Sequence, residues 1–216
     1  MVRPMTIRIP VLMAAAAAIF ALAPRATAGL PPIERHNWSA GVAYGVGHAD
    51  IDFVNDEINV DGRRGGTPQY HLGKMIGDHF LVSFVNRQWQ DEGGLRDIKI
   101  RSNTQSFSLM LTAFPGRTTN WTSGFYLQGG YGYANARISA LQRVPGGMDE
   151  HGNTYTPIQV EDEGGTALAL GAGYEFRISR HFAAGVNFSY NHLSIDGDIF
   201  DQVTFIPGGI NLNWYF

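Results

Sequence analysis

The feature that most constrains the fold is a strict period of two in the last stretch of the chain. Large apolar residues, Ile210, Leu212, Trp214 and Phe216, alternate there with Asn211, Asn213 and Tyr215. Successive side chains of a β-strand point to opposite faces, so this period predicts a strand with two different faces. An unpaired strand with an aromatic face invites edge-to-edge aggregation. A closed membrane barrel removes that edge, because its last strand pairs with its first.

Seven further alternating segments precede this one. The eight segments span about residues 37–48, 66–76, 80–90, 99–113, 121–138, 165–177, 181–194 and 203–216. The second is the least regular, because Pro68 and Lys74 break its alternation. The sequence therefore predicts an all-β fold, an eight-stranded antiparallel up-and-down transmembrane β-barrel.

Residue size indicates which face points outward. One face of the segments is crowded with Gly, Ala, Ser and Thr, which suits the narrow lumen of an eight-stranded barrel. The other face carries large aromatics, several near segment ends as in an interfacial girdle: Trp38, Phe80, Trp121, Phe125, Phe176, Trp214 and Phe216. The alternative is a secreted soluble sandwich or barrel, which would hold its apolar face inside.

The connections alternate in predicted length. Short turns are expected at about 77–79, 114–120 and 178–180, and longer polar loops at about 49–65, 91–98, 139–164 and 195–202. Outer-membrane barrels have short periplasmic turns and longer extracellular loops. The pattern therefore places both termini in the periplasm, which requires an even number of strands. Acidic residues in the first and third loops indicate a solvated surface rather than a calcium loop.

Residues 1–28 have the pattern of a secretory signal peptide. Arg3 and Arg8 are followed by an apolar run, and a small-x-small cleavage site ends at Ala28. The alternative is a membrane anchor helix, but the run is shorter than the ~20 residues that span a bilayer. We expect cleavage near Ala28 and an outer-membrane barrel domain over residues 29–216.

Composition narrows the class of partner and cofactor. The chain has no cysteine, so it has no disulfide framework and no thiolate metal site. Its formal net charge is −3 and becomes more negative when the arginines of the leader are removed. A nucleic-acid partner would require a basic face, so we expect none. No residue pattern predicts a metal or a cofactor.

Three features together resemble the small eight-stranded bacterial outer-membrane barrels of the opacity and surface-antigen type. They are the leader, the Gly-aromatic repeat over residues 129–133 and the alternating strand that ends in Phe216. The resemblance implies an outer-membrane monomer surrounded by lipid and lipopolysaccharide. It also implies that Ile210, Leu212, Trp214 and Phe216 form the signal read by the barrel-assembly machinery. Members of this family differ in function, so the resemblance indicates location and fold better than activity. The expected role is non-enzymatic: envelope-structural, or interaction with a host or surface ligand through extracellular loops.

A narrow small-solute channel is one alternative function. Polar residues predicted to face the lumen are Arg87, Gln128, Glu175, Asn187, Asn191 and Asn213. They are expected to form a hydrogen-bonded plug, in which the buried Glu175 finds a cation or several donors. The many small lumen residues leave a narrow path open as the other interpretation.

Basic residues near the outer rim indicate contact with lipopolysaccharide. Lys99, Arg101 and Arg137 have the parity of the lipid face on two neighbouring segments. Arginine binds phosphate with bidentate geometry, so this cluster is predicted to contact lipopolysaccharide phosphates. The alternative is ordinary snorkelling of long side chains at the interface.

A lipid A ester deacylase is the other alternative function. His192 and Ser194 share the lipid-face parity, and a His-x-Ser pair there is similar to outer-membrane lipid A deacylases. That similarity implies His192 as base and Ser194 as nucleophile. The positions expected to face them, Thr204 and Ile206, supply no orienting acid. The nearest acids are in the following loop: Asp196, Asp198 and Asp201.

Overall fold

The computed structural model describes residue 35 and residues 37–53, 59–95, 98–116, 124–143, 155–198 and 200–216. The predicted signal peptide and Trp121 lie outside this part of the chain, so their assignments remain predictions. None of the helices in the described part is both long and apolar enough to cross a membrane.

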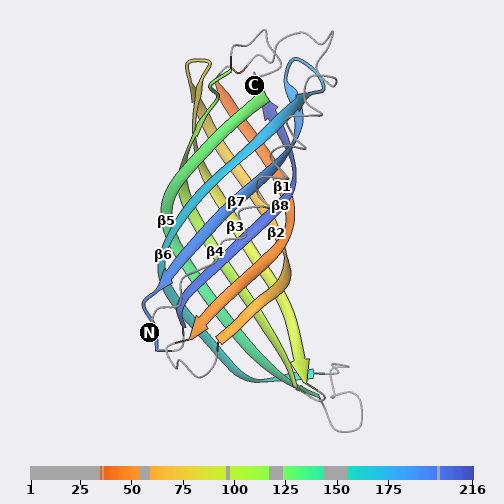
Figure 1. Ribbon diagram of the computed structural model, residues 1–216, viewed down its shortest axis with the longest axis vertical. Coiled ribbons are helices and arrows are strands. Elements are labelled where there is room, and N and C mark those ends of the chain that lie inside the picture. The colour runs from red at the N-terminus through yellow and green to blue at the C-terminus, as the bar shows by residue number, and fades with distance from the viewer. Residues whose placement is uncertain are drawn as a thin grey trace.

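Eight strands form one closed barrel (Figure 1). They are β1 (Trp38–Phe53), β2 (Asn59–Ile76), β3 (Phe80–Leu95), β4 (Ile98–Ala113), β5 (Phe125–Arg143), β6 (Tyr155–Arg177), β7 (Phe182–Ile195) and β8 (Phe200–Tyr215). Each strand pairs antiparallel with its neighbour in sequence, and β8 pairs with β1. The predicted eight-stranded antiparallel barrel is confirmed, and its last strand has the partner that it needed.

The two ends of the barrel differ. One end, here called the turn end, carries the turns after β2 and β6, at residues 77–79 and 178–181. Gly77 has φ of 63° in the first of these turns, a conformation that glycine adopts without strain. The opposite end, here called the loop end, carries the connections after β1, β3, β5 and β7. The strands end at the turn end close to the predicted positions.

At the loop end the strands are longer than predicted. Within the described residues, strand takes up much of the expected loops at 49–65, 91–98 and 139–164 and part of that at 195–202: β3, for example, runs to Leu95 and β4 begins at Ile98. Backbone pairing needs no apolar face, so the ladders continue past the lipid-facing residues. The sequence did not predict these extensions, because the residues near the loop end lack both a clear alternation and large apolar side chains.

The exterior of the turn half is apolar. The large exposed side chains include Phe84, Ile210 and Val46, which are 75%, 66% and 63% exposed. A continuous apolar exterior of this kind belongs in lipid rather than in water. The prediction that the large apolar face points outward is therefore confirmed. Exposed aromatics surround the turn end: Trp38, Phe80, Phe182, Trp214 and Phe216.

Towards the loop end, the two faces of the wall exchange character. Along β7 the exterior changes from Tyr190 to His192, while the lumen side changes from Asn191 to Leu193. On β8 the lumen residue at this level is the buried Phe205, and its neighbour Thr204 has the parity of the exterior, although only 7% of it is exposed. The turn half is thus apolar outside, and its interior combines the buried polar side chains with a small apolar cluster of Met75, Leu81, Phe114, Tyr126, Ala183 and Tyr215. The loop half resembles a soluble barrel, with an apolar interior.

Candidate functional site

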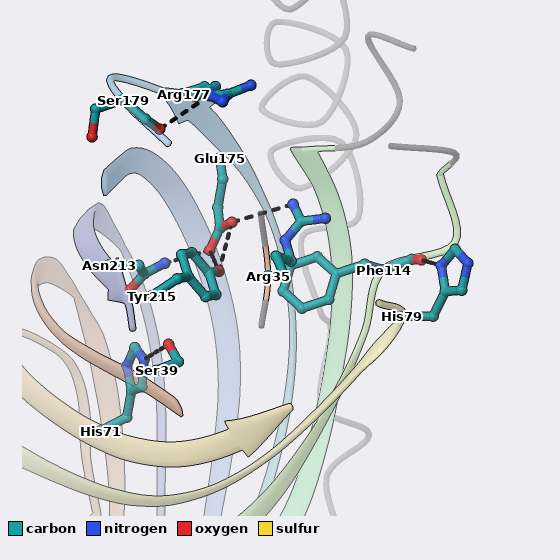
Figure 2. A network of polar contacts seen from close by, with 10 residues as sticks. All are labelled: Arg35, Ser39, His71, His79, Phe114, Glu175, Arg177, Ser179, Asn213 and Tyr215. Carbon is teal, nitrogen blue, oxygen red and sulfur yellow. Dashed lines mark hydrogen bonds and ion pairs between the residues drawn. The ribbon is translucent and has the colours of Figure 1, made fainter. Parts of the chain in front are cut away.

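A buried polar network fills the lumen at the turn end (Figure 2). Glu175 accepts hydrogen bonds from the Tyr215 hydroxyl, which lies 2.8 Å from each carboxylate oxygen, and from the Asn213 amide. Arg35 forms an ion pair with Glu175 at 3.4 Å and places its guanidinium 3.8 Å above the Phe114 ring. The expectation that Glu175 finds a cation or several donors is confirmed, and the structure supplies both.

The strand register explains how these side chains meet. Glu175 on β6 pairs with Gly185 on β7, which in turn pairs with Asn211 on β8. Gly185 has no side chain, and a Cβ there would lie 2.6 Å from the Asn211 amide oxygen. The glycine therefore leaves room for polar side chains from β6 and β8 to approach each other across β7. Arg35 was not foreseen, because it precedes the first strand and has no alternation to assign it to the lumen.

A second polar layer crosses the middle of the lumen. The Arg87 guanidinium donates from Nε to Gln69 Oε1 at 2.7 Å and from Nη1 to Asn191 Oδ1 at 2.9 Å. Arg87 is 1% exposed and connects β3 with β7. Two predicted plug residues, Arg87 and Asn191, are therefore in direct contact.

Between these two layers lies a small cavity. Its volume, counted as the space open to the centre of a water molecule, is about 30 Å³. Gln128 and Asn187, two further residues of the predicted plug, line it together with Glu175 and Asn213. A cavity of this size holds a few water molecules and no larger solute.

An apolar cluster, here called the apolar seal, closes the lumen at the loop end. It comprises Ala49, Ile51, Trp89, Ala134, Ala136, Ala167, Leu193, Ile195, Val203 and Phe205. Trp89 is 0% exposed, and its ring centroid lies 5.6 Å from that of Phe205. The sequence analysis did not predict the seal. A signal was present, because the lumen-facing positions of β7 and β8 change from Asn and Ser to Leu, Val and Phe at this level.

The predicted basic cluster lies on the exterior near the loop end. Arg101 on β4 pairs with Ser139 on β5, while Arg137 pairs with Asn103. Arg101 and Arg137 are therefore diagonal neighbours, both exposed, within reach of one ligand. Lys99 lies two residues beyond Arg101 on β4, where only the backbone is described.

Arg137 also has an acidic neighbour. It pairs with Asp162 on β6, and Asp162 accepts a hydrogen bond from the Asn135 amide. A carboxylate thus competes with any phosphate for Arg137. Lipopolysaccharide contact by Lys99, Arg101 and Arg137 remains a prediction that the strand register makes geometrically feasible.

His192 and Ser194 both lie on the exterior of β7. The His192 Nδ1 atom lies 3.1 Å from Thr204 Oγ1, and within the described residues its side chain has no hydrogen bond with Ser194. Ser194 pairs with Gln202, so the expectation that Ile206 faces this pair is wrong. The expectation that Thr204 faces this pair is confirmed, since Thr204 pairs with His192.

The neighbouring strand supplies acids that the sequence did not indicate. Thr204 pairs with Asp50 on β1, and Gln202 donates from Nε2 to Asp52 Oδ2 at 2.7 Å. The deacylase assignment of His192 and Ser194 stays an untested hypothesis. No group of three metal-binding side chains occurs in the part of the chain that the structure describes.

The terminal strand has the predicted faces. Ile210, Leu212, Trp214 and Phe216 are all on the exterior, and between 43% and 66% of each is exposed. The Trp38 amide donates to the Phe216 carbonyl at 2.8 Å, and the Phe216 amide donates back at 2.9 Å. Phe216 therefore takes part in the seam between first and last strands, while its role as an assembly signal stays a prediction.

Several solved structures are similar to this chain. Ail, the attachment invasion locus protein of Yersinia pestis, was solved in complex with the heparin analogue sucrose octasulfate. It has 16% identity and a TM-score of 0.52, over 82% of this chain and 99% of Ail. Neisserial surface protein A has 12% identity and a TM-score of 0.47, over 82% and 97%. OprG from Pseudomonas aeruginosa has 16% identity and a TM-score of 0.43, over 85% and 100%.

No curated protein matches the chain. A family model does: that of the outer membrane protein beta-barrel domain matches residues 12–216. The location of the protein is the bacterial outer membrane, in agreement with the apolar exterior of the turn half. The chain therefore belongs to the outer membrane protein β-barrel family.

Proposed function

We propose that this protein is a sealed barrel that acts through its outward surface, in an envelope-structural or surface-interaction role without enzymatic activity. The observation that carries the proposal is the closure of the lumen at three levels. These levels are the Glu175 network, the Arg87 layer and the apolar seal. When the interior of a barrel is filled with its own side chains, other molecules can contact only its exterior and its loops.

The narrow channel is the competing function, and the apolar seal is the main argument against it. A polar solute that crossed the seal would lose its water and find, beside Trp89 and Phe205, a single side-chain donor in replacement, the Trp89 indole N–H. Transport would also require Arg87 to leave both of its partners. The resting barrel is therefore proposed to be impermeable.

Lipopolysaccharide is the surface ligand that the exterior supports best. Long extracellular connections are typical of the family architecture, so we take the loop end as the cell-surface end. Arg101 and Arg137 lie there beyond Phe107 and Tyr133, which belong to the lipid-facing band. Two guanidinium groups at headgroup height suit phosphates of lipid A. Ail, which has the same fold, was solved with an anionic sulfated sugar, and this supports an anionic glycan as the ligand class.

Assembly and oligomeric state complete the proposal. The closed hydrogen-bonded ladder leaves no strand edge for a second copy, which supports a monomer inserted by the barrel-assembly machinery. The loop tips at residues 54–58, 96–97, 144–154 and 199 lie outside the described residues. A host ligand for them remains an expectation.

Conductance in planar lipid bilayers tests the sealed state. The wild-type protein is expected to give no discrete current steps. A Trp89→Ala plus Phe205→Ala variant removes the largest side chains of the seal and is expected to give frequent small steps. A Phe84→Ala variant, altered only on the lipid-facing exterior, is the matched control and should stay silent. Wild-type steps equal to those of the double variant would favour the channel.

A further inference from the structure

We propose that the turn end of the lumen is a guanidinium-binding site, which Arg35 occupies as a tethered ligand. Arg35 then acts as a removable plug for this end of the barrel. The inference goes beyond the sealed state proposed above, because it assigns closure of the turn end to a contact that can open while the apolar seal stays in place. It also names the chemical class of group that the site accepts.

Two groups of the site suit a planar cation. Glu175 places a carboxylate oxygen 3.4 Å from the Arg35 guanidinium, and the Phe114 ring centroid lies 3.8 Å from Arg35 Cζ. Figure 2 shows the guanidinium beside Glu175 and over the Phe114 ring. Tyr126 packs against that ring, with 5.8 Å between the two centroids. A guanidinium stacks on an aromatic face and pairs with a carboxylate, and it loses less hydration in doing so than an ammonium ion.

A fixed turn directs Arg35 into the lumen. Asn37 has φ of 56°, in the left-handed region that asparagine adopts more readily than most residues. Its carbonyl accepts a hydrogen bond from the Met75 amide at 2.7 Å. The strand ladder begins at the next residue, where the Trp38 amide donates to the Phe216 carbonyl. The chain is therefore anchored at Asn37, and Arg35 lies two residues before this anchor, outside β1.

The site keeps its frame without Arg35. Asn213 and Tyr215 lie on β8 and donate to the Glu175 carboxylate from within the closed ladder. Their positions depend on strand pairing and not on Arg35. If Arg35 leaves, the carboxylate therefore keeps these hydrogen bonds and its place in the lumen, but it loses a cation. An anionic site beside an aromatic ring remains, and it can accept another guanidinium group.

Arg35 also stands between the turn end and the small cavity of the lumen. Glu175 and Phe114, the two groups that hold the guanidinium, both line that cavity. Departure of Arg35 should join the space of its side chain to the cavity and make the lining accessible from the turn end. The apolar seal would still close the barrel at the loop end. The turn half would then be a blind polar cup rather than a channel.

A single introduced thiol tests the plug. The chain has no cysteine, and Ser83 is a buried residue that lines the cavity, so Ser83→Cys supplies a unique reporter of nearly the same size. In the full chain refolded into detergent micelles, methyl methanethiosulfonate should label this thiol about tenfold faster once Arg35→Ala is added, as expected for loss of a hydrogen bond to a charged group. Arg180→Ala, at an exposed arginine of the same end, is the matched control and should not change the rate. Equal rates with and without Arg35 would overturn the proposal.

Added cations test the chemical class of ligand. Millimolar guanidinium, far below the molar concentrations that unfold proteins, should slow the labelling of Arg35→Ala towards the rate seen with Arg35 in place. Methylammonium at the same concentration should not, because its compact group cannot stack flat on Phe114. Glu175→Gln in the same background removes the negative charge and should abolish the protection. Protection by both cations alike, or by neither, would refute a guanidinium site.

Two further measurements complete the test. If Arg35→Ala fails to fold, Arg35→Lys keeps the charge and loses the planar group, so labelling should still be faster and should still be slowed by guanidinium. A labelling rate equal to that with Arg35, and unchanged by guanidinium, would overturn the proposal. Arg35→Ala should also stay silent in planar lipid bilayers, because the apolar seal is intact. Current steps from this variant would refute the blind cup, since the turn end would not then open alone.

Discussion

At the scale of single residues, Glu175 shows how a carboxylate is held inside the barrel. It is 2% exposed, and it is matched by one cation, Arg35, and by donors from Asn213 and Tyr215. A buried charge is tolerated only when its lone pairs are satisfied in this way. Arg35 and Glu175 are 140 positions apart in the chain, so their pairing forms only when the barrel is complete.

Removing one donor should weaken the network measurably. Tyr215→Phe deletes the hydroxyl that lies 2.8 Å from both Glu175 oxygens. We expect the free energy of unfolding to fall by about 1.5–3 kcal/mol, as for hydrogen bonds to charged groups. Urea titration of the protein in lipid vesicles, followed by intrinsic fluorescence, measures this loss. Tyr131→Phe, on the lipid-facing exterior, is the control and should have little effect; equal losses in both variants would argue against a special role of the network.

At the scale of the element, each strand is one continuous ladder that passes through two environments. On β1 the exterior residue Val46 is followed by the exterior residue His48, and on β7 Tyr190 is followed by His192. On the lumen side of β7 the change is the reverse, from the polar Asn191 to the apolar Leu193. Backbone pairing is indifferent to this change, which is why the strands extend further than their apolar alternation.

A pair of substitutions on β1 should locate the edge of the lipid band. Val42 is 48% exposed near the middle of the apolar exterior, and an arginine at the bilayer midplane of a barrel costs about 2–4 kcal/mol. Val42→Arg is therefore expected to lower stability by that amount in lipid vesicles. His48→Arg, six residues further on the same face, should cost roughly 0–1 kcal/mol. Similar costs at both positions would place the boundary of the lipid elsewhere.

At the scale of the whole molecule, closure produces both the seam and the seal. The hydrogen bonds between Trp38 and Phe216 join the first and last strands. Closure also brings β3 and β8 across the lumen from each other, so that Trp89 and Phe205 meet. These contacts support the picture of a plugged barrel whose exterior carries its function.

Assembly in cells should depend on Phe216 more than the stability of the finished barrel does. Phe216→Ala keeps the backbone seam, so refolding into detergent should remain near wild type. If the exterior aromatic is read by the assembly machinery, the amount of folded protein in outer-membrane fractions should fall several-fold. Phe182→Ala, another exposed aromatic at the turn end, is the matched control. Equal membrane levels for Phe216→Ala and wild type would show that this residue is not part of the signal.

The sequence by itself determined the number of strands and their order, because a period of two is local and most segments display it independently. It also indicated which face meets lipid, because small residues share one face and large apolar residues share the other. It also placed Arg101 and Arg137 on the same exterior wall, since parity and neighbouring strands were sufficient for that. Only the tertiary structure decided the interior. Arg87 and Asn191 are 104 residues apart. Their contact depends on the stagger with which eight strands close, and no local pattern encodes that stagger. The entry of Arg35 into the lumen and the apolar seal depend on the same register.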